Sequence, residues 1–409
     1  MRTVSIEELK KILAGLPENP RIIASGNFST PKTLLKVIDE NVEKYIIHVL
    51  NAQVEIPNRP GVTHETAFVG VGMRHSKNLD YIPTRLSLLP IVIRDHYRPD
   101  VVLLHTSLPR FDTVSLGTEV NILPAAIETA RMHGGIVIAQ ANKNMPYTYG
   151  DAQIYENDID FLVEVDEPLT THIQGGSTEI ATSIGERIAH VIEDGSTLQV
   201  GIGAVPDVIL SLLLKRNRLR IWTEMFSDGV LNLWKAGALD DEVPITASFV
   251  FGSQELYDWL NLNRKVRMLR TEKTNDPSQI ARQAKMTSVN AGLQVDLFDQ
   301  ANASRVRGKI YSGFGGSTDF IVGALHSRGG RSFMALPSWH KKTNSSTIVP
   351  LITEAVTSFQ HSYVVTENGM AACFGHSESE QARNLIEKAA HPDARAHLWE
   401  KAFEFGLVR

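Results

Sequence analysis

The 409-residue chain has a single cysteine, and this scarcity excludes two classes of protein. One thiol cannot form an internal disulfide or a thiolate metal cluster. The letters around Cys373 are GMAACFG, mostly small and apolar, which favours a buried structural residue over a nucleophile. The histidines, 14 in number, show no pair at ligand spacing, so we predict no metal site.

The sequence also lacks a long hydrophobic run and a strong excess of charge. No segment reaches the roughly 20 apolar residues that cross a bilayer. The start, MRTVSIEELKKILAGL, has the pattern of an amphipathic helix rather than of a signal peptide. The formal net charge of −5 argues against nucleic acid or an anionic membrane as a partner. We therefore expect a protein of the reducing cytoplasm.

What the chain does contain is a regular alternation of short apolar segments with longer helical patterns. Segments of the first half that read as strands include RIIAS, KYIIHVL, DVVLLHTS and GIVIAQAN; those of the second include TLQVGIG, LRIWTE, ITASFVFGS, SFMALPS and SYVVTEN. Several are hydrophobic throughout, as parallel strands covered on both faces are. The pattern predicts an α/β fold of two open domains, each a mostly parallel sheet covered by helices. We place the boundary near residue 185, which gives domains 1–185 and 186–409.

Two glycine turns in the second half could serve a ligand. In VGIGAVPDVI, Gly201 and Gly203 form a tight turn before a helix that Pro206 opens, and bare backbone at a helix N-terminus can donate to a phosphate or an oxyanion. A strand–turn–helix joint without a ligand explains this segment equally well. A dinucleotide site is disfavoured because Pro206 stands where the third glycine would permit close helix–strand packing. The second turn, in IYSGFGGSTDFIVGA, contains Gly315 and Gly316.

Between these turns, the segment LRIWTEMFSDGV places Glu224 at the end of a predicted strand. A carboxylate there, with two glycine turns in the same half, suggests a cleft at the carboxyl edge of a parallel sheet. The acid could cap a turn or pair with an arginine, or it could be a general base or a nucleophile toward an activated acyl group. Metal ligation is disfavoured because no histidine or acid lies at ligand spacing.

Many segments together resemble the acetyl-CoA hydrolase/transferase family, and within it the 4-hydroxybutyrate CoA-transferase branch of the class I CoA-transferases. In the second half these are VGIGAVPDVI, TEMFSDGV, FVFGSQELYDW, NAGLQVDL, IYSGFGGSTDFIVGA, IVPLIT, VVTENGMA and AAHPDARAHL. In the first half, DYIPTRLS, RPDVVLLHTSLP and NKNMPYTYGDAQIYENDIDFLVE are similar to that family's first domain. The resemblance runs in order along nearly the whole chain.

The resemblance implies a CoA-transferase-like fold with its active site in the interdomain cleft. It also implies a ping-pong reaction in which Glu224 is the covalent nucleophile, carrying first an acyl group and then coenzyme A. Coenzyme A would be a substrate rather than a permanently bound cofactor, the other partner would be a small carboxylate, and the chain would form a homo-oligomer. An acyl-CoA hydrolase that uses the same glutamate, and a non-catalytic CoA- or nucleotide-binding protein, remain alternatives.

The family's binding residues map onto this chain by motif. The CoA-binding loop matches Gly201, Ile202, Gly203, Ala204 and Val205; the glycine at the thioester matches Gly316, with Gly315 beside it; and the lysine that faces CoA matches Lys341. A solvated charge explains Lys341 equally well. For contact with the acyl group we expect Asn27, Phe28 and Met145, from the loops ASGNFSTP and NKNMPYTYG, although ordinary packing would explain them too.

Three positions depart from the family's pattern. Its arginine before IVP is Thr347, so the resemblance does not carry over any phosphate contact that this arginine makes. Its GGQ has become GGS, with Ser317 as the last residue, and its tGQ element has become Phe298-Asp299-Gln300. None of these changes affects the glutamate or the glycines, so they bear on the substrate rather than on the chemistry.

Overall fold

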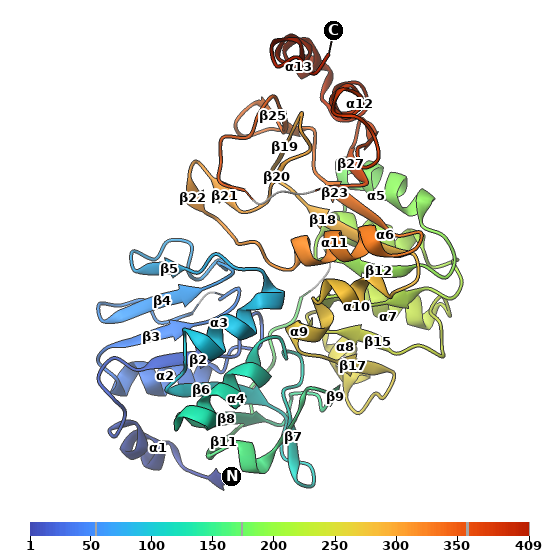
Figure 1. The fold of residues 1–409 in the computed structure, drawn as a ribbon. Coiled ribbons are helices and arrows are strands. Elements are labelled where there is room, and N and C mark those ends of the chain that lie inside the picture. The colour runs from blue at the N-terminus through green and yellow to red at the C-terminus, as the bar shows by residue number, and fades with distance from the viewer. Residues whose placement is uncertain (54, 173–174, 357–359, 409) are drawn as a thin grey trace. The chain divides into compact units, whose positions relative to one another are not determined.

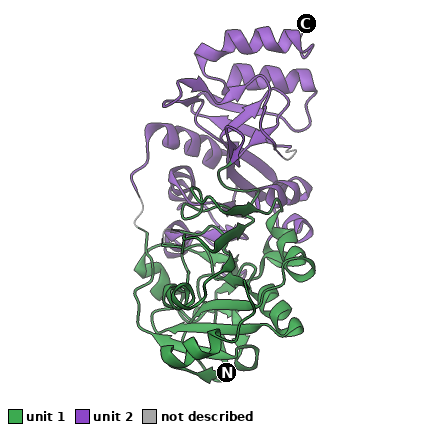
Figure 2. Cartoon of the chain, turned by 90° about the vertical axis from the view of Figure 1, so that its left-hand side faces the viewer, with its two compact units in different colours: residues 1–173, 244–274, 310–315 green, residues 174–243, 275–309, 316–409 purple. Residues whose placement is uncertain are grey.

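The computed structural model describes residues 1–53, 55–172, 175–356 and 360–408, and its chain forms two compact units. Unit 1 comprises residues 1–173, 244–274 and 310–315, and unit 2 comprises residues 174–243, 275–309 and 316–409 (Figure 2). Each unit is therefore built from segments that are distant in the sequence. Residue 185, the predicted boundary, lies inside a helix of unit 2, and the division into domains 1–185 and 186–409 stays a prediction.

Unit 1 is centred on an eight-stranded sheet (Figure 1). Every neighbouring pair in it is parallel. All six residues of its strand VVLLHT are buried, so both faces of that strand are covered. In spatial order the strands are β1 (Arg2–Thr3), β11 (Phe161–Val165), β8 (Ile136–Asn142), β6 (Val101–Thr106), β2 (Arg21–Ala24), β3 (Tyr45–His48), β4 (Val62–Thr66) and β5 (Leu79–Tyr81).

Helices and smaller sheets complete unit 1. The amphipathic start of the chain forms a helix whose capping box joins Ser5 and Glu8, and its buried Leu9 and Leu13 enter the same core cluster as Ile22 of the sheet. The helices of this unit are α1 (Ile6–Leu13), α2 (Lys32–Asn41), α3 (Leu89–Asp95), α4 (Leu123–His133), α8 (Gln254–Leu260) and α9 (Thr271–Thr274). Its remaining strands are β7 (Thr113–Ser115), β9 (Tyr149–Gly150), β10 (Gln153–Tyr155), β15 (Ile245–Ala247), β16 (Phe249–Val250) and β17 (Val266–Met268).

Unit 2 is centred on a six-stranded sheet. Its first five strands are parallel, and the last pairs antiparallel with its neighbour. The order is β13 (Arg220–Ile221), β12 (Thr197–Val200), β18 (Met286–Ala291), β23 (Arg331–Ala335), β27 (Tyr363–Thr366) and β28 (Gly369–Ala372). The helices are α5 (Glu179–Val191), α6 (Ala204–Leu212), α7 (Asp228–Lys235), α10 (Pro277–Ala281), α11 (Ser317–His326), α12 (Glu378–Asn384) and α13 (Pro392–Glu404).

Short strands follow the carboxyl ends of the central strands of unit 2. They are β14 (Met225–Phe226), β19 (Gln294–Asp296), β20 (Ala301–Asn302), β21 (Arg305–Val306), β22 (Lys309–Ile310, which crosses the unit boundary), β24 (Trp339–His340), β25 (Ser345–Ser346) and β26 (Ile348–Val349). The predicted α/β fold with mostly parallel sheets is confirmed. Among the described residues, no helix combines the length and the apolar character needed to cross a bilayer.

Candidate active site

The carboxyl edge of the unit 2 sheet brings the predicted glycine loop and the predicted carboxylate together. β12 and β13 are adjacent and parallel, so both strands end at the same edge. The loop beginning at Gly201 follows β12 directly, and Glu224 lies three residues beyond β13. Between β13 and Glu224, the Thr223 hydroxyl donates to the Met225 backbone carbonyl at 2.8 Å and thereby fixes the turn that presents the acid.

Two amide groups from later segments hold the Glu224 carboxylate. The Asn275 side-chain amide donates to Glu224 Oε2 at 3.0 Å, and the Gly316 backbone amide donates to the same carboxyl group. Asn275 is fully buried just before α10, and Gly316 is the residue before α11. Both partners are neutral hydrogen-bond donors, of a kind that stabilises developing negative charge.

The environment raises the pKa of Glu224 to about 7. Part of the residue remains accessible to solvent, but protein atoms surround its carboxyl group, and this burial is the main cause of the shift. The negative charge of the buried Asp319, in the first turn of α11, raises the pKa further, whereas the two amide donors lower it. Burial raises the pKa of Glu272 and Asp296 as well, so what distinguishes Glu224 is the raised pKa together with its two amide donors and its place at the sheet edge.

Close contact explains the glycine at position 316. A Cβ atom there would lie 2.1 Å from Glu224 Oε2 and 2.1 Å from Asn275 Nδ2, well inside van der Waals contact. The backbone of Gly316 is in an ordinary region, with φ of −98°, so space rather than conformation demands the glycine. Gly315, beside it, has φ of +57°, which favours glycine for the conformation itself.

The loop from Gly201 to Val205 borders open space. Cβ atoms built on Gly201 and Gly203 meet nothing within 4 Å, and Ile202 is exposed. Gly203 has φ of +130° and directly precedes α6, where no side chain caps the first amides. Pro206 lies in the first turn of that helix, as the sequence predicts. The geometry suits an anion or an oxyanion, and the loop's contact with coenzyme A stays a prediction.

Lys341 is exposed in the hairpin formed by β24 and β25, and its contact with coenzyme A also stays a prediction. The predicted acyl-contact residues follow strands of the unit 1 sheet. Asn27 is buried, and its side-chain amide donates to Glu119 Oε2 at 2.8 Å. Phe28 stacks on Phe251 with ring centroids 3.4 Å apart.

Met145 is buried in unit 1, where its sulfur accepts a hydrogen bond from the Thr118 hydroxyl at 3.8 Å. The internal contacts of Asn27, Phe28 and Met145 account for their packing, and a contact of theirs with the acyl group stays a prediction. Cys373 is fully buried, as predicted, and burial raises its pKa well above the ordinary value.

Asn275 and Asp319 are the site residues that the sequence analysis missed. Asn275 stands in TNDP, a pattern typical of a turn that begins a helix, and Asp319 stands in the first helical turn of STDF. Each pattern has a local structural explanation, so neither signals a contact with Glu224. Among the described residues, no group of three or more His, Cys, Asp or Glu side chains is placed to hold a metal ion.

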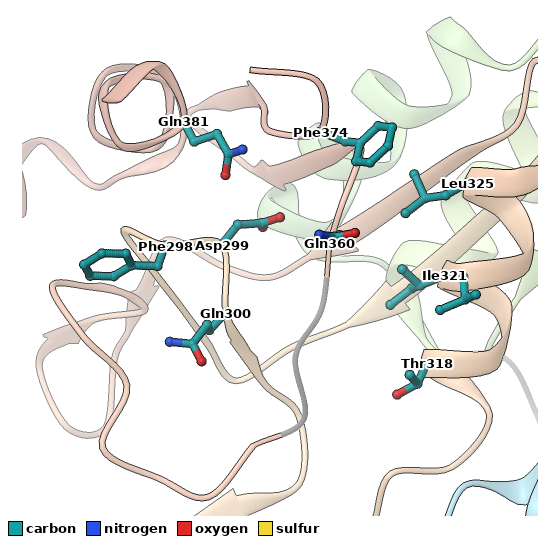
Figure 3. A pocket seen from close by; sticks show the side chains of 10 residues that line it. Phe298, Asp299, Gln300, Thr318, Ile321, Leu325, Gln360, Phe374 and Gln381 are labelled. Atoms are coloured by element: carbon teal, nitrogen blue, oxygen red, sulfur yellow. The ribbon is translucent and has the colours of Figure 1, made fainter. Parts of the chain in front are cut away.

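A separate cavity of about 470 Å³ lies along α11 (Figure 3). Ile321 and Leu325 of the helix lie on one side of it, and Phe298 lies on the other. Its wall includes Asp299, whose carboxylate accepts from the His361 backbone amide at 2.8 Å and contacts His361 Nδ1 at 2.6 Å. The described residues that line it include no lysine or arginine, so this part of the wall does not suit phosphate groups.

Comparison with solved structures identifies the fold as that of CoA-transferases. The structure of RipA from Yersinia pestis is 27% identical, with a TM-score of 0.91 over 100% of this chain and 98% of that one. The 4-hydroxybutyrate CoA-transferase from Porphyromonas gingivalis is 28% identical, with a TM-score of 0.82 over 99% of this chain and 98% of that one.

Sequence comparison gives the family. The 4-hydroxybutyrate coenzyme A transferase of Clostridium kluyveri is 34% identical over 412 residues, which cover 95% of each chain. Residues 252–402 match the family model of the acetyl-CoA hydrolase/transferase C-terminal domain. The chain belongs to the acetyl-CoA hydrolase/transferase family, and the resemblance seen in the sequence is confirmed.

Proposed function

We propose that the chain is an acyl-CoA:carboxylate CoA-transferase with Glu224 as its covalent nucleophile. The observation that carries the proposal is a carboxylate of raised pKa, held by the amides of Asn275 and Gly316, beside a glycine loop at one sheet edge. Relatives named as a 4-hydroxybutyrate CoA-transferase and as a butyryl-CoA:acetate CoA-transferase support a short-chain acyl-CoA and a small carboxylate, such as 4-hydroxybutyrate or acetate, as the substrates.

The reaction proceeds through two covalent forms of Glu224. Its ionised carboxylate attacks the thioester carbonyl of the acyl-CoA. The C–S bond breaks, coenzyme A leaves as the thiolate, and the acyl group stays on Glu224 as an acyl-glutamyl anhydride. The thiolate then attacks the glutamyl carbonyl, releases the acyl group as a free carboxylate and leaves a glutamyl-CoA thioester. The second carboxylate substrate attacks this thioester, and the same two steps in reverse produce the new acyl-CoA. The thioester bond energy is thus retained throughout.

The neighbours of Glu224 have a role in each attack on the glutamyl carbonyl. The oxygen of the glutamyl carbonyl becomes an oxyanion in the tetrahedral intermediate. The Asn275 and Gly316 amides, which donate to the free carboxylate, could donate to this oxyanion as well. The uncapped N-terminus of α6 and the loop before it provide further donors for the coenzyme. Contacts with the remote parts of coenzyme A would supply orientation for the reacting centre. A homo-oligomeric state and a cytoplasmic location stay predictions.

The pH dependence tests the role of the carboxylate. Only the ionised form attacks, so kcat/KM for acetyl-CoA is expected to rise with pH through about 7, the pKa of Glu224. Asp319→Asn removes a negative charge that raises this pKa, so the midpoint of the rise should move to lower pH. The control is Asp112→Asn at an exposed position, which should leave the midpoint in place. A midpoint that Asp319→Asn leaves unmoved, or moves upward, contradicts the assignment.

The choice of acceptor separates a transferase from a hydrolase. Acetyl-CoA is incubated with 4-hydroxybutyrate, butyrate, propionate or succinate, or with no acceptor, and both free thiol and new acyl-CoA are measured. A transferase forms the acceptor's CoA ester much faster than it releases thiol without an acceptor. Thiol release that is equally fast in both cases would instead assign a hydrolase that uses the same glutamate.

A trapping experiment tests the intermediate itself. After mixing with acetyl-CoA, borohydride should reduce the glutamyl-CoA thioester to an alcohol at residue 224, and mass spectrometry of the tryptic peptide 221–235 should detect it. If this peptide is unmodified while products accumulate, the covalent mechanism is wrong.

A further inference from the structure

A second pocket of unit 2 differs in charge from the cavity along α11. It encloses about 250 Å³ between β19, β21 and the β24–β25 hairpin. Two guanidinium groups, Arg305 and Arg307, line it together with His340 and a single carboxylate, Glu354. Hydroxyl groups make up much of the remaining wall, on Thr343, Ser345, Ser346 and Thr347. Guanidinium groups are side chains that phosphate groups prefer, whereas the Ser346 hydroxyl already donates to the Ile348 carbonyl at 2.7 Å.

Arg305 and Glu354 both contact the turn at Gly308 in this pocket. Both oxygens of the Glu354 carboxylate accept from the Gly308 backbone amide, at 3.0 and 2.8 Å, so this acid holds the turn after Arg307. Arg305 Nη1 donates to the Gly308 carbonyl at 3.1 Å, while Arg307 is exposed. The described lining contains two arginines and one carboxylate, and Lys341 and Lys342 follow His340 in the same hairpin.

The histidine also presents a donor. The Thr343 backbone amide donates to His340 Nδ1 at 3.2 Å, so that nitrogen is an acceptor and the proton of the neutral ring is on Nε2. Thr347 does not add a free donor, because its hydroxyl donates to the Pro337 carbonyl at 2.6 Å. Arg305 and Arg307 supply the guanidinium groups of the same pocket.

The place of the pocket in the sheet fits a long ligand. Gln294 and His340, which line it, follow the carboxyl ends of β18 and β23, and Glu224 follows β13 at the same edge. In the order β13–β12–β18–β23, three strand spacings of about 4.8 Å separate the outer two strands. By this spacing Gln294 and His340 lie two and three strands from β13, roughly 10 and 14 Å, so a ligand that reacts at Glu224 and reaches this pocket needs its charged end at a comparable distance from its reactive end.

We propose that Arg305 and Arg307 bind phosphate groups of the coenzyme A half of the acyl-CoA. The inference rests on the proposed function, because coenzyme A joins its thioester to its phosphates through a long pantetheine arm. The cavity along α11 has no cationic side chain in its wall and does not offer an alternative phosphate site among the described residues. The two arginines would then contribute to the binding of coenzyme A and take no part in the acyl transfer.

The test compares Arg305→Gln/Arg307→Gln and Arg307→Gln alone with the wild type, using Arg328→Gln at an exposed position after α11 as the matched control. Loss of charged hydrogen bonds to phosphate should raise KM for acetyl-CoA about tenfold or more in the double variant, with kcat nearly unchanged. The single variant, at an exposed residue, limits the risk of misfolding, and thermal melting checks all three. An unchanged KM in the folded double variant overturns the proposal.

Binding of coenzyme A, dephospho-CoA and pantetheine identifies which phosphates are held. If the 3′-phosphate is bound, the wild type prefers coenzyme A over dephospho-CoA and the double variant loses this preference. If the diphosphate is bound, the double variant weakens both of these ligands equally. Pantetheine has no phosphate, so its binding should be unaffected by either substitution, and an equal loss for pantetheine contradicts the proposal.

These results are independent of the covalent chemistry. If trapping fails at residue 224 while the arginine variants still lose coenzyme A, the proposed reaction is wrong and the phosphate site stands. If trapping succeeds and the arginine variants bind coenzyme A normally, the reaction stands and the phosphate site is wrong.

Discussion

Replacing Glu224 by glutamine is expected to reduce CoA exchange by at least about 10⁴-fold, because removal of a covalent nucleophile typically costs several orders of magnitude in rate. Glutamine keeps the shape of the side chain and one oxygen that can accept from Asn275 and Gly316. It cannot form an anhydride with the acyl group or hold coenzyme A as a thioester. The rate of acetyl-CoA consumption with a carboxylate acceptor measures the loss.

The same variant should fold and bind coenzyme A normally, since its substitution adds no heavy atoms to the site. Glu242→Gln, at an exposed acid of unit 2, is the matched control and should retain full activity. Isothermal titration with coenzyme A separates binding from chemistry. If Glu224→Gln turned over as fast as the wild type, Glu224 would have only a structural role. The reaction would then need another nucleophile.

Much of the fold could be predicted because its strands are locally hydrophobic. The segments VVLLHT and TLQV are buried along their whole length, as strands in the middle of covered parallel sheets are. The length of individual strands was less predictable. LRIWTE reads as one strand, but only Arg220 and Ile221 pair with β12, and the chain turns away before the acid.

The interleaving of the two units could not be predicted from the sequence. ITASFVFGS reads as one strand of the second half, yet it divides into β15 and β16, and β15 belongs to unit 1. β15 pairs with β17, and β17 pairs in turn with β9 of unit 1, where Arg267 lies opposite Tyr149. This three-stranded sheet places β15 in unit 1. Such pairing depends on residues more than 100 positions apart, and local hydrophobic patterns contain no information about it.

The candidate site shows the same division between local and distant information. Glu224 and Gly316 could be singled out because a strand-end acid and a glycine turn are visible within a few letters, and the family resemblance supports both. Asn275 and Asp319 could not, because their nearest neighbours in the sequence already explain them as turn and helix residues. Only the folded chain shows that segments 51 residues apart meet at one carboxylate.

Adding a single methyl group at residue 316 is expected to reduce activity by about 10²-fold, the usual effect of displacing a catalytic group by about 1 Å. In Gly316→Ala, the new Cβ would lie 2.1 Å from Glu224 Oε2 and 2.1 Å from Asn275 Nδ2. Both side-chain ends must shift, which is expected to disturb the hydrogen bond between them and the one from the residue 316 amide. The carboxylate would therefore lose its orientation and its donors at once.

Gly176→Ala is the matched control, because a Cβ there meets nothing within 4 Å and the backbone has no positive φ. It should leave kcat and KM as in the wild type. In Gly316→Ala the loss should fall mainly on kcat, since the displaced atoms belong to the reacting centre rather than to the coenzyme's phosphates. A wild-type kcat in this variant would show that the contact between residue 316 and Glu224 has no part in the reaction. A loss confined to KM would instead assign the glycine to coenzyme binding.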